Sequence, residues 1–573
     1  MSNLDHGLVN ANSLTGIGTI EEALDALQPG RKPGEISLFD EILTDQLASA
    51  KTLLVDVANA SEANKAEVEE GARLLTQARE AADTARRIFD AAVAARLGWI
   101  DPGLILDDKS LQRVLNMPEV VEAPEELQPA HMPYLFPEVF LRSEAGFDVI
   151  LGNPPWEELV YEEIKFWTLR FPGLKGHPVK RQRELIDGYR SSRPDLVSEM
   201  ESEREAANAV RAVLAKGPFP GLEKGHADLY KAFAWRFLQF TRKAGRFAVV
   251  LPRTAMSALG SAEWRSAVLD KGTFASVTNL LNTGGWIFEG VDGRYSVALV
   301  VAHVGSDGDV YVSGPYSDIK SFVDRVDTDG VTVRKEQLRE WSAGVSFPLL
   351  PSADSLEIFL RLRDSPSVCQ PRSDFEFAPV QGDFNQTTDA SLWSVGDFSK
   401  SIPVLKGGSF DIWSPDAGLP HGSAAAKAIH ERVMTKLRRQ VRTSSSAFYG
   451  MDVDELNREH RLPYQQPRIA FRDITNQTNT RTTVAALVPP AVLVNSAPVL
   501  IRRSGGARAE AYLLGVMCSI PFDWYARRYV ELHMNFHIFN WLPVPLFDEE
   551  SASSKRVVEI AGSLAAVDDR YEK

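Results

Sequence analysis

The sequence predicts an α/β fold for the central part of this 573-residue chain. Two apolar runs of the kind found in buried strands, at 147–152 and 246–252, flank a long stretch whose apolar residues recur at helical spacing. Two further strands are expected at 274–281 and 296–302, with a helical pattern at 261–269 ahead of them. Strands that alternate with helices predict a mostly parallel sheet covered by helices.

The residues ahead of this region are expected to be helical. The stretch from Ser37 to about Leu97 is rich in Ala, Glu, Leu and Arg, and its apolar residues follow helical spacing. This pattern predicts a long helical hairpin. A partner-binding coiled coil is the alternative, but the apolar stripe is mostly alanine. Prolines then predict a linker, at positions 118, 124, 129, 133 and 137.

The last part of the chain has a different pattern. Beyond Trp341 the sequence consists of short segments of β-forming residues separated by many turn residues, without strand–helix–strand units. We therefore expect a domain boundary near 345 and an α+β domain after it.

Composition restricts the class of protein. With 44% hydrophobic and 24% charged residues, the chain has the composition of a globular protein. No apolar run approaches the roughly 20 residues of a membrane span, and the start lacks a signal-peptide pattern, so we expect a cytoplasmic protein without membrane contact. The two cysteines, Cys369 and Cys518, have no His or Cys at ligand spacing, so we expect buried thiols and no metal site.

Charge gives two opposing indications about nucleic acid. The formal net charge of −14 argues against it, because lysine and arginine supply most non-specific DNA affinity. The basic residues are nevertheless clustered, within 165–193, 432–442 and 502–508. Such clusters are solvated faces in most proteins and nucleic-acid contacts in some.

The segment Asn153-Pro154-Pro155-Trp156 directly follows the first predicted strand, where α/β proteins place their chemistry. Its residue types suit an amine acceptor site. The adenine amine is a poor nucleophile, and the Asn153 side-chain oxygen and the Pro154 carbonyl can accept its hydrogens once the base leaves the helix. The prolines stiffen the loop and offer no N–H to compete, and Trp156 can stack on the base.

This strand and loop together resemble motif IV of the amino-methyltransferases of restriction-modification and related phage-defence systems. The resemblance implies a Rossmann-like class I methyltransferase domain that uses S-adenosylmethionine. An asparagine as first residue implies methylation of adenine N6 in duplex DNA. Asn153, Pro154, Pro155 and Trp156 would then be the catalytic residues.

Other segments resemble further motifs of that family in the same order. Residues 6–16 resemble motif III, which implies that Asn12 and Ser13, with Asn153, contact the cofactor. Asp228-Leu229-Tyr230 resembles the helix after motif IV, and 245–252 resembles motif VI. Ile287-Phe288-Glu289-Gly290-Val291 resembles motif VIII, which implies that Phe288 faces Trp156 across the extruded base.

The C-terminal half resembles the family's target-recognition domain. Its markers are the segments 467–473 and 513–545. Arginines in such a domain can pair with guanine edges or phosphates. The candidate DNA-contacting residues of the whole chain are Lys180, Arg181, Arg183, Arg438, Arg439, Arg468, Arg472 and Arg503.

One expected motif is missing. The glycine-rich loop that should hold the methionine part of S-adenosylmethionine ought to precede motif III, and nothing clear stands there. Leu14-Thr15-Gly16-Ile17-Gly18 imitates it loosely, but lacks the acidic start. The stronger hypothesis is a split enzyme, in which a partner polypeptide supplies this loop and the first strands and leaves this chain with an open sheet edge.

The resulting expectation is an incomplete methyltransferase domain, a helical insertion and an α+β target-recognition domain. Its parts are the start of the core at 1–36, the insertion and linker at 37–140, the catalytic core at 141–345, the recognition domain at 346–550 and a C-terminal helix or tail at 551–573. The expected partners are duplex DNA, the polypeptide with the missing loop and other defence-system subunits. A DNA-binding subunit without activity, and a methyltransferase for RNA or protein glutamine, remain alternatives.

Overall fold

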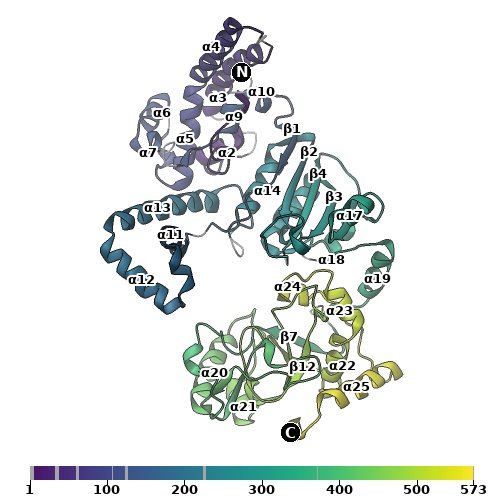
Figure 1. Ribbon diagram of the computed structural model, residues 1–573. Coiled ribbons are helices and arrows are strands. Elements are labelled where there is room, and N and C mark those ends of the chain that lie inside the picture. Colours follow the sequence, from purple (N-terminus) through teal and green to yellow (C-terminus); the bar gives the residue numbers. More distant parts are fainter. Residues whose placement is uncertain are drawn as a thin grey trace. The chain divides into compact units, whose positions relative to one another are not determined.

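A computed structural model describes residues 6–32, 38–59, 63–105, 107–122, 127–159, 161–222, 227–293, 295–342, 344–368, 370 and 372–571 (Figure 1). The protein is a mixed α/β chain with three sheets and many helices in these residues. It divides into two compact units. The first comprises Met1–Val312, Tyr316–Val323 and Thr332–Ser346, and the second comprises Ser313–Pro315, Asp324–Val331 and Phe347–Lys573.

The first unit begins with a bundle of helices. They are α2 (Ile20–Leu27), α3 (Leu38–Asn59), α4 (Lys65–Ala81), α5 (Asp83–Leu97), α6 (Asp108–Leu115), α7 (Pro118–Val121), α9 (Met132–Leu135) and α10 (Pro137–Phe140). Most of their buried side chains form one core, which includes Ile17, Phe39 and Phe89. The expected hairpin is confirmed in part, because α3 packs against α4 but the second arm is divided into two helices, α4 and α5. The Asn64 side chain caps the start of α4, and α5 begins anew at Asp83.

The expected linker is wrong. The helices α7, α9 and α10 each carry a proline in the first turn, where a missing N–H costs nothing. Residues 127–132 pack against the N-terminal segment, since the N–H groups of Ala130 and Met132 donate to the carbonyls of Asn12 and Ile17. Prolines in this sequence therefore start short helices that complete the core of the bundle.

A six-stranded sheet follows, in the order β1-β2-β4-β3-β5-β6. Its strands are β1 (Phe147–Gly152), β2 (Thr241–Pro252), β3 (Gly272–Leu281), β4 (Ser296–Val304), β5 (Val310–Tyr316) and β6 (Val331–Val333). β1 is parallel to β2, but β4 is antiparallel to both β2 and β3. The expectation of a mostly parallel sheet therefore fails at β4, because the loop between β3 and β4 holds no crossover helix of the kind that parallel neighbours need.

Helices precede and follow the strands of this sheet. α14 (Leu229–Phe240) leads directly into β2, while α15 (Thr254–Ser257) and α16 (Ala262–Lys271) connect β2 to β3. α17 (Ile319–Arg325) and α18 (Lys335–Trp341) lie near the end of the unit. Trp264 of α16 is buried against Phe247 of β2 and Phe274 of β3, which fixes this helix to the sheet.

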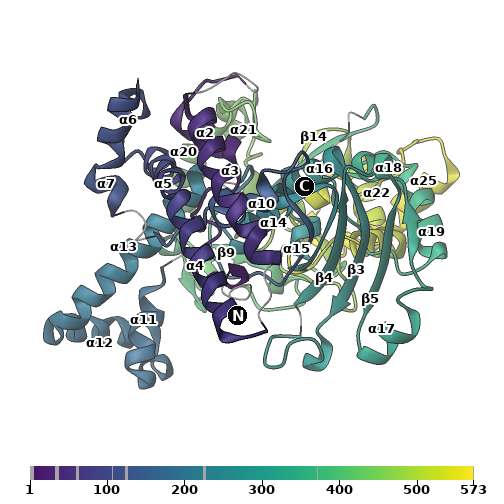
Figure 2. The same cartoon turned by 90° about the horizontal axis from the view of Figure 1, so that it is seen from above.

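An arm of three helices separates β1 from α14. It consists of α11 (Glu163–Arg170), α12 (Val179–Ser192) and α13 (Pro194–Lys216), which both views show standing away from the sheet (Figures 1 and 2). The arm has a small core of its own around Trp167, where the rings of Phe171 and Tyr189 stack with centroids 3.9 Å apart. A short antiparallel bridge between Glu158 and Asp228 closes its base.

The second unit contains two four-stranded sheets over one apolar core. Their orders are β13-β9-β10-β8 and β12-β11-β14-β7. The strands are β7 (Glu376–Val380), β8 (Ser394–Val395), β9 (Ile402–Leu405), β10 (Gly422–Ala424), β11 (Arg468–Phe471), β12 (Ala485–Val488), β13 (Val492–Leu493) and β14 (Val499–Ser504). The helices are α19 (Ala353–Arg363), α20 (Ala426–Gln440), α21 (Val453–Arg458), α22 (Ala507–Met517), α23 (Ile520–Ala526), α24 (Phe536–Phe539) and α25 (Ala552–Ala565).

The C-terminal segment is part of this second unit. Helix α25 packs closely on α22 at Gly515, where a Cβ atom would lie 2.6 Å from Val557. Farther on, the Tyr571 hydroxyl donates to the carbonyl of Leu487, and the guanidinium of Arg570 pairs with Asp416. The residues after 551 are therefore anchored on the same core as the sheets.

Candidate functional site

Several loops gather where β1 and β2 end. The segment after β1 carries Asn153, and the segment after β2 begins α15. The start of α14 joins them, because the N–H of Leu229 donates to the carbonyl of Glu157 at 3.0 Å and the N–H of Leu159 donates to that of Ala227. Because β1 and β2 are parallel, their carboxyl ends share one edge of the sheet, which is where α/β proteins bind ligands.

The loop after β1 presents two unused acceptors. Asn153 is exposed and Pro154 is buried. In the described part of the chain, no donor bonds to the side-chain oxygen of Asn153 or to the carbonyl of Pro154. These two oxygens are therefore available to hydrogen-bond donors of a ligand, such as an amino group.

The structure brings Trp156 and Phe288 together. Their ring centroids lie 5.6 Å apart, and the ring planes are nearly perpendicular, at 89°. The indole N–H of Trp156 donates to the carbonyl of Val250 in β2, at 3.4 Å. Two aromatic side chains from loops 132 residues apart thus form one contact beside Asn153, in the geometry that aromatic edge-to-face pairs prefer.

A residue that sequence reasoning missed organises the second of these loops. Asn282, fully buried at the end of β3, accepts hydrogen bonds from the N–H groups of Ile287 and Phe288 and donates to the carbonyls of Phe288 and Val291. The available signal was an asparagine at a strand end ahead of Thr-Gly-Gly, since asparagine side chains often bond to nearby backbone.

Tyr230 anchors the start of α14 behind the same loops. Its side chain is buried, and burial raises the pKa of its hydroxyl to about 12, although the nearby hydroxyls of Thr254 and Ser261 oppose that shift. Both of these residues follow β2. Neighbouring Lys231 pairs with Asp228 at 3.1 Å. The Asp-Leu-Tyr segment thus ties α14 to the loops after β1 and β2.

The N-terminal candidates are placed in the helical bundle. Asn12 uses its side-chain oxygen to accept from the N–H of Leu14 at 3.0 Å, and its backbone pairs with Gln128 and Ala130. Ser13 is half-buried beside it. In the described residues no hydrogen bond joins Asn12 or Ser13 to the loop of Asn153.

The Leu-Thr-Gly-Ile-Gly segment at 14–18 is closed to ligands. A Cβ at Gly16 would lie 2.1 Å from the carbonyl oxygen of Ala130, so the glycine serves close packing. Arg236 of α14 donates to the carbonyl of Gly16, and the N–H of Gly18 donates to Glu22. Since these groups already have partners and the segment is buried, it does not fit the role of a cofactor loop.

Glu22 links this segment to two helices. Its carboxylate pairs with Arg236 at 2.6 Å and with Arg96 at 2.7 Å. Burial alone would raise the pKa of Glu22, but the two guanidinium charges and the hydrogen bonds from Arg236 and Gly18 outweigh it and lower the pKa to about 2. Glu22 is therefore ionised at neutral pH and holds α2, α5 and α14 together.

The outer edge of β1 is open. No described strand pairs with it, and Val149 and Leu151, which point to the same face, are 62% and 75% exposed. Elsewhere on the strand, Phe147 contacts Phe136 and Phe140, and Ile150 packs against the same cluster. A strand this apolar is typical of the interior of a sheet, and an open edge of this kind readily accepts another strand.

The basic candidates of the first unit lie on α12 of the arm. Lys180, Arg181 and Arg183 are all exposed, and Arg181 pairs only with Glu184 on its own helix at 3.0 Å. No residue of α12 is buried. The three side chains are therefore free to contact a polyanion.

The basic candidates of the second unit fall into two groups. Arg438, Arg439 and Arg503 are exposed. Arg438 pairs with Asp454, and Arg503 lies 3.3 Å from Glu376. These three remain candidates for contact with a polyanion.

Arg468 and Arg472 use their guanidinium groups in contacts within the second unit. Arg468 is 4% exposed; its guanidinium binds Asp383 at 2.8 and 2.9 Å and the carbonyl of Ala491. Arg472 donates to the carbonyls of Gly407 and Phe410. The expectation that these two contact DNA is not kept, because the guanidinium donors already have partners inside the unit.

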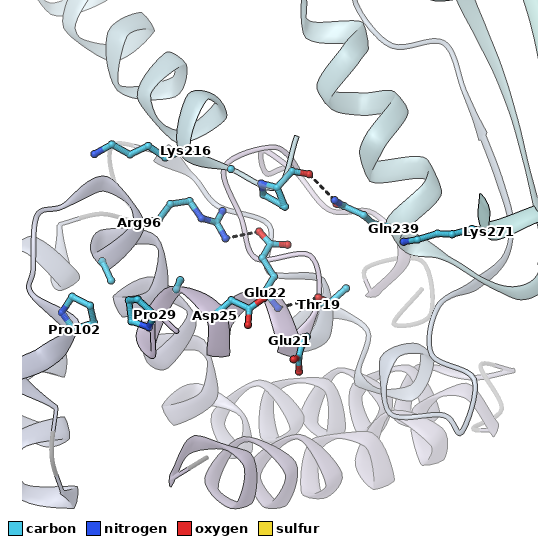
Figure 3. Close-up of a pocket in the computed structure, with 14 residues that line it drawn as sticks. Thr19, Glu21, Glu22, Asp25, Pro29, Arg96, Pro102, Lys216, Gln239 and Lys271 are labelled. Atoms are coloured by element: carbon cyan, nitrogen blue, oxygen red, sulfur yellow. Dashed lines mark hydrogen bonds and ion pairs between the residues drawn. The ribbon is translucent and has the colours of Figure 1, made fainter. Parts of the chain in front are cut away.

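A cavity of about 610 Å³ in the first unit lies elsewhere (Figure 3). Glu22 and Arg96 line it together with Lys216, Gln239 and Lys271. Gln239 lies two residues before the start of β2 and Lys271 directly before β3, so this cavity lies at the end of the sheet opposite to Asn153. We assign no chemistry to it.

Among the described residues, no cluster of three or more His, Cys, Asp or Glu side chains is arranged to bind a metal ion. No helix in the described ranges has the length and apolar character needed to cross a membrane. Cys518 is buried, and burial raises the pKa of its thiol to about 12, while Cys369 lies outside the described residues.

Comparisons with known proteins show weak likenesses only. No family model and no curated protein matches the chain. The chain is similar to a nuclease-deletion mutant of the Type ISP restriction-modification enzyme LlaGI, with a TM-score of 0.34 and 10% identity over 98% of this chain and 47% of that chain. It is also similar to the Type IIL restriction-modification enzyme MmeI in complex with DNA, with a TM-score of 0.31 and 11% identity over 98% of this chain and 73% of that chain. For the type IIG restriction endonuclease BpuSI the TM-score is 0.26 and the identity 12%, over 94% of this chain and 71% of that chain. The chain spans less than half the length of the first of these proteins, and TM-scores this low carry no conclusion about its activity.

Proposed function

We propose that this chain is the catalytic and target-reading part of an N6-adenine DNA methyltransferase of a restriction-modification or phage-defence system. The observation that carries the proposal is the Asn153-Pro154-Pro155-Trp156 loop. It follows β1 at the carboxyl edge of the sheet, leaves two oxygens without partners and sets Trp156 against Phe288. Its reaction would transfer the methyl group of S-adenosylmethionine to the amine of an adenine that has left the DNA helix.

In this reaction each residue has a separate role. The Asn153 oxygen and the Pro154 carbonyl would accept the two amine hydrogens and favour a tetrahedral nitrogen whose lone pair attacks the methyl carbon. S-adenosylmethionine would supply the methyl group, whose bond to sulfur breaks as the N–C bond forms, and the alkylated nitrogen would lose a proton to water. Trp156 and Phe288 would hold the base by stacking, a contact worth about 1–3 kcal/mol per base.

The chain is proposed to need a partner for the rest of the cofactor site. Two observations support this. The Leu-Thr-Gly-Ile-Gly segment is packed against Ala130 and bonded to Arg236, so it offers no cofactor loop. The strand that leads to Asn153 has an open outer edge with exposed Val149 and Leu151. A polypeptide that adds strands beside β1 would complete the sheet and bring the missing glycine-rich loop next to Asn153.

The test is transfer of a tritiated methyl group from S-adenosylmethionine to unmethylated duplex DNA. The chain is assayed alone and together with the product of the adjacent upstream reading frame. We expect transfer to adenine only when both are present. Transfer by the chain alone would refute the need for a partner but would agree with the proposed activity.

Two results would refute the proposed reaction. If neither preparation transfers methyl while both bind DNA, the chain is a recognition subunit without activity. If RNA or a protein glutamine is methylated in competition with DNA, the substrate class is wrong. Asn153→Ala serves as the inactive control. Glu157→Gln, at an exposed residue of the same loop, serves as the control that should leave activity unchanged.

A further inference from the structure

All donors and acceptors of the Asn282 side chain have hydrogen-bond partners. A side-chain amide has two donor hydrogens and an oxygen with two lone pairs, and here all four are used within 3.1 Å. The partners also settle the orientation of the amide, because N–H groups must face the oxygen and carbonyls must face the nitrogen. Asn282 is fully buried, so water cannot replace these bonds.

Two of the four hydrogen bonds of the Asn282 side chain are made to one residue, Phe288. Both the N–H and the carbonyl of Phe288 bond to Asn282, at 3.0 and 3.1 Å. The backbone of Asn282 is itself fixed, since its N–H donates to the carbonyl of Tyr295 and its carbonyl accepts from Gly285. The loop is therefore held most firmly at the position that carries the aromatic ring.

Trp156, the other ring of the pair, is anchored through its side chain. Its only hydrogen bond in the described residues is the indole contact with Val250, and 3.4 Å is long for such a bond. The ring is half-buried, whereas the flanking Pro155 and Glu157 are exposed. The two aromatic side chains thus differ in how they are anchored.

The present ring geometry cannot hold a base. The two ring planes are at 89° with centroids 5.6 Å apart, so the rings contact each other edge to face and leave no space for a base between them. The rings must separate for the base to enter. Asn282 fixes the backbone from which the Phe288 side chain projects, and so determines where one of the two rings starts.

We infer that Asn282 is a positioning residue, which fixes the backbone of Phe288 and thereby places its ring in the base-stacking site. This inference rests on the proposed function and adds a residue to it. Asn282 would act through Phe288 and not by contact with the base.

The first test is a double-mutant cycle on methyl transfer to duplex DNA, with the upstream product present. Asn282→Asp keeps the shape and the oxygen acceptor and removes the two donors. We expect it to lower kcat on the order of tenfold, with less than about a twofold further effect in a Phe288→Ala background. Equal losses in both backgrounds would overturn the inference, because Asn282 would then act independently of Phe288.

A matched control separates positioning from general loosening of the loop. Trp286→Phe removes a single hydrogen bond from the same loop, the one that the Trp286 indole donates to the carbonyl of Leu281 at 2.7 Å. It leaves Phe288 bonded to Asn282, so we expect little change in kcat. If Trp286→Phe reproduces the loss, the effect belongs to the loop as a whole and the inference fails. Thermal melting confirms that each variant is folded.

The second test does not depend on methyl transfer. Amide hydrogen exchange of the intact chain reports on the N–H groups of Ile287 and Phe288, which we expect to exchange at least about tenfold faster in Asn282→Ala than in the wild type. Unchanged exchange would overturn the inference. If the wild type transfers no methyl but exchange responds as expected, the proposed function fails while Asn282 is still shown to hold Phe288.

Discussion

The Trp156 ring has two separable properties, its aromatic face and its indole N–H. Trp156→Ala removes both, and we expect a loss in kcat/KM for methyl transfer of about 5-fold to 150-fold, the equivalent of about 1–3 kcal/mol of stacking. Trp156→Phe keeps the face and removes the 3.4 Å contact with Val250, so most of the activity should remain. Equal losses in the two variants would mean that the indole N–H, and not stacking, accounts for the effect.

Arg468 shows how burial decides between a structural and a DNA-contacting arginine. Arg468→Ala would remove the guanidinium partner of the Asp383 carboxylate, which is only 9% exposed, and we expect the free energy of unfolding to fall by about 3–5 kcal/mol, measured by denaturant titration. Exposed Arg439→Ala, on α20, should leave stability unchanged and weaken DNA binding. A stable Arg468→Ala variant with weakened DNA binding would contradict this assignment.

Single residues show where prediction from sequence ends. The loop of Asn153 and the ring of Phe288 were recognisable because each belongs to a local motif. Asn282 and Glu22 were not, since their roles depend on partners that the fold brings together. Glu22 bonds to Arg236, 214 positions away. The predicted DNA contacts of Arg468 and Arg472 are not kept, because a basic residue type does not reveal whether the fold already uses its guanidinium.

At the scale of elements, the four strands predicted at 147–152, 246–252, 274–281 and 296–302 are confirmed as β1 to β4. β2 extends back to Thr241 and β3 to Gly272, because pairing with neighbours lengthens strands beyond their apolar runs. The antiparallel direction of β4 was not foreseen, since periodicity identifies a strand but not its orientation. The second arm of the hairpin and the expected linker differ from the prediction, because caps and first-turn prolines divide this region into more helices.

The helical arm provides a test of DNA contact at the level of one element. Replacing Lys180, Arg181 and Arg183 on α12 by alanine removes three exposed cations that have no partner outside their own helix. We expect weaker DNA binding, and a salt dependence whose log–log slope is smaller by roughly 0.9 for each phosphate that is no longer neutralised. Fluorescence anisotropy at several salt concentrations measures this slope. An unchanged slope would mean that α12 is only a solvated face.

The Glu22 ion cluster should give the helical bundle a defined pH dependence. The pKa of Glu22 is lowered in the folded state to about 2 from an ordinary value of 4.5. Its stabilising effect is therefore complete above pH 4.5 and is lost as the pH falls toward about 2. Glu22→Gln should lower the free energy of unfolding by about 3–5 kcal/mol at neutral pH, because Arg96 and Arg236 lose their partner.

Thermal melts of wild type and Glu22→Gln across this pH range check that expectation. The gap between the two melting temperatures should narrow as the pH falls below 4.5. A gap that is independent of pH would show that Glu22 stabilises the bundle by packing and not by charge.

At the scale of the whole molecule, we propose a chain that reads and holds the target but lacks part of the cofactor site. The loops at the carboxyl ends of β1 and β2 would provide the amine acceptors and the aromatic pair. The open edge of β1 indicates where further strands would attach. The second unit, with its exposed Arg438, Arg439 and Arg503, would read the sequence around the target.

The most direct measurement is the content of N6-methyladenine in DNA from cells that express this chain together with the upstream reading frame. Nucleosides from the digested DNA are quantified by mass spectrometry, with Asn153→Ala as the paired sample. We predict N6-methyladenine above background with the wild type and none above background with Asn153→Ala. Equal amounts in the two samples, or methylation only at cytosine, would contradict the proposed function.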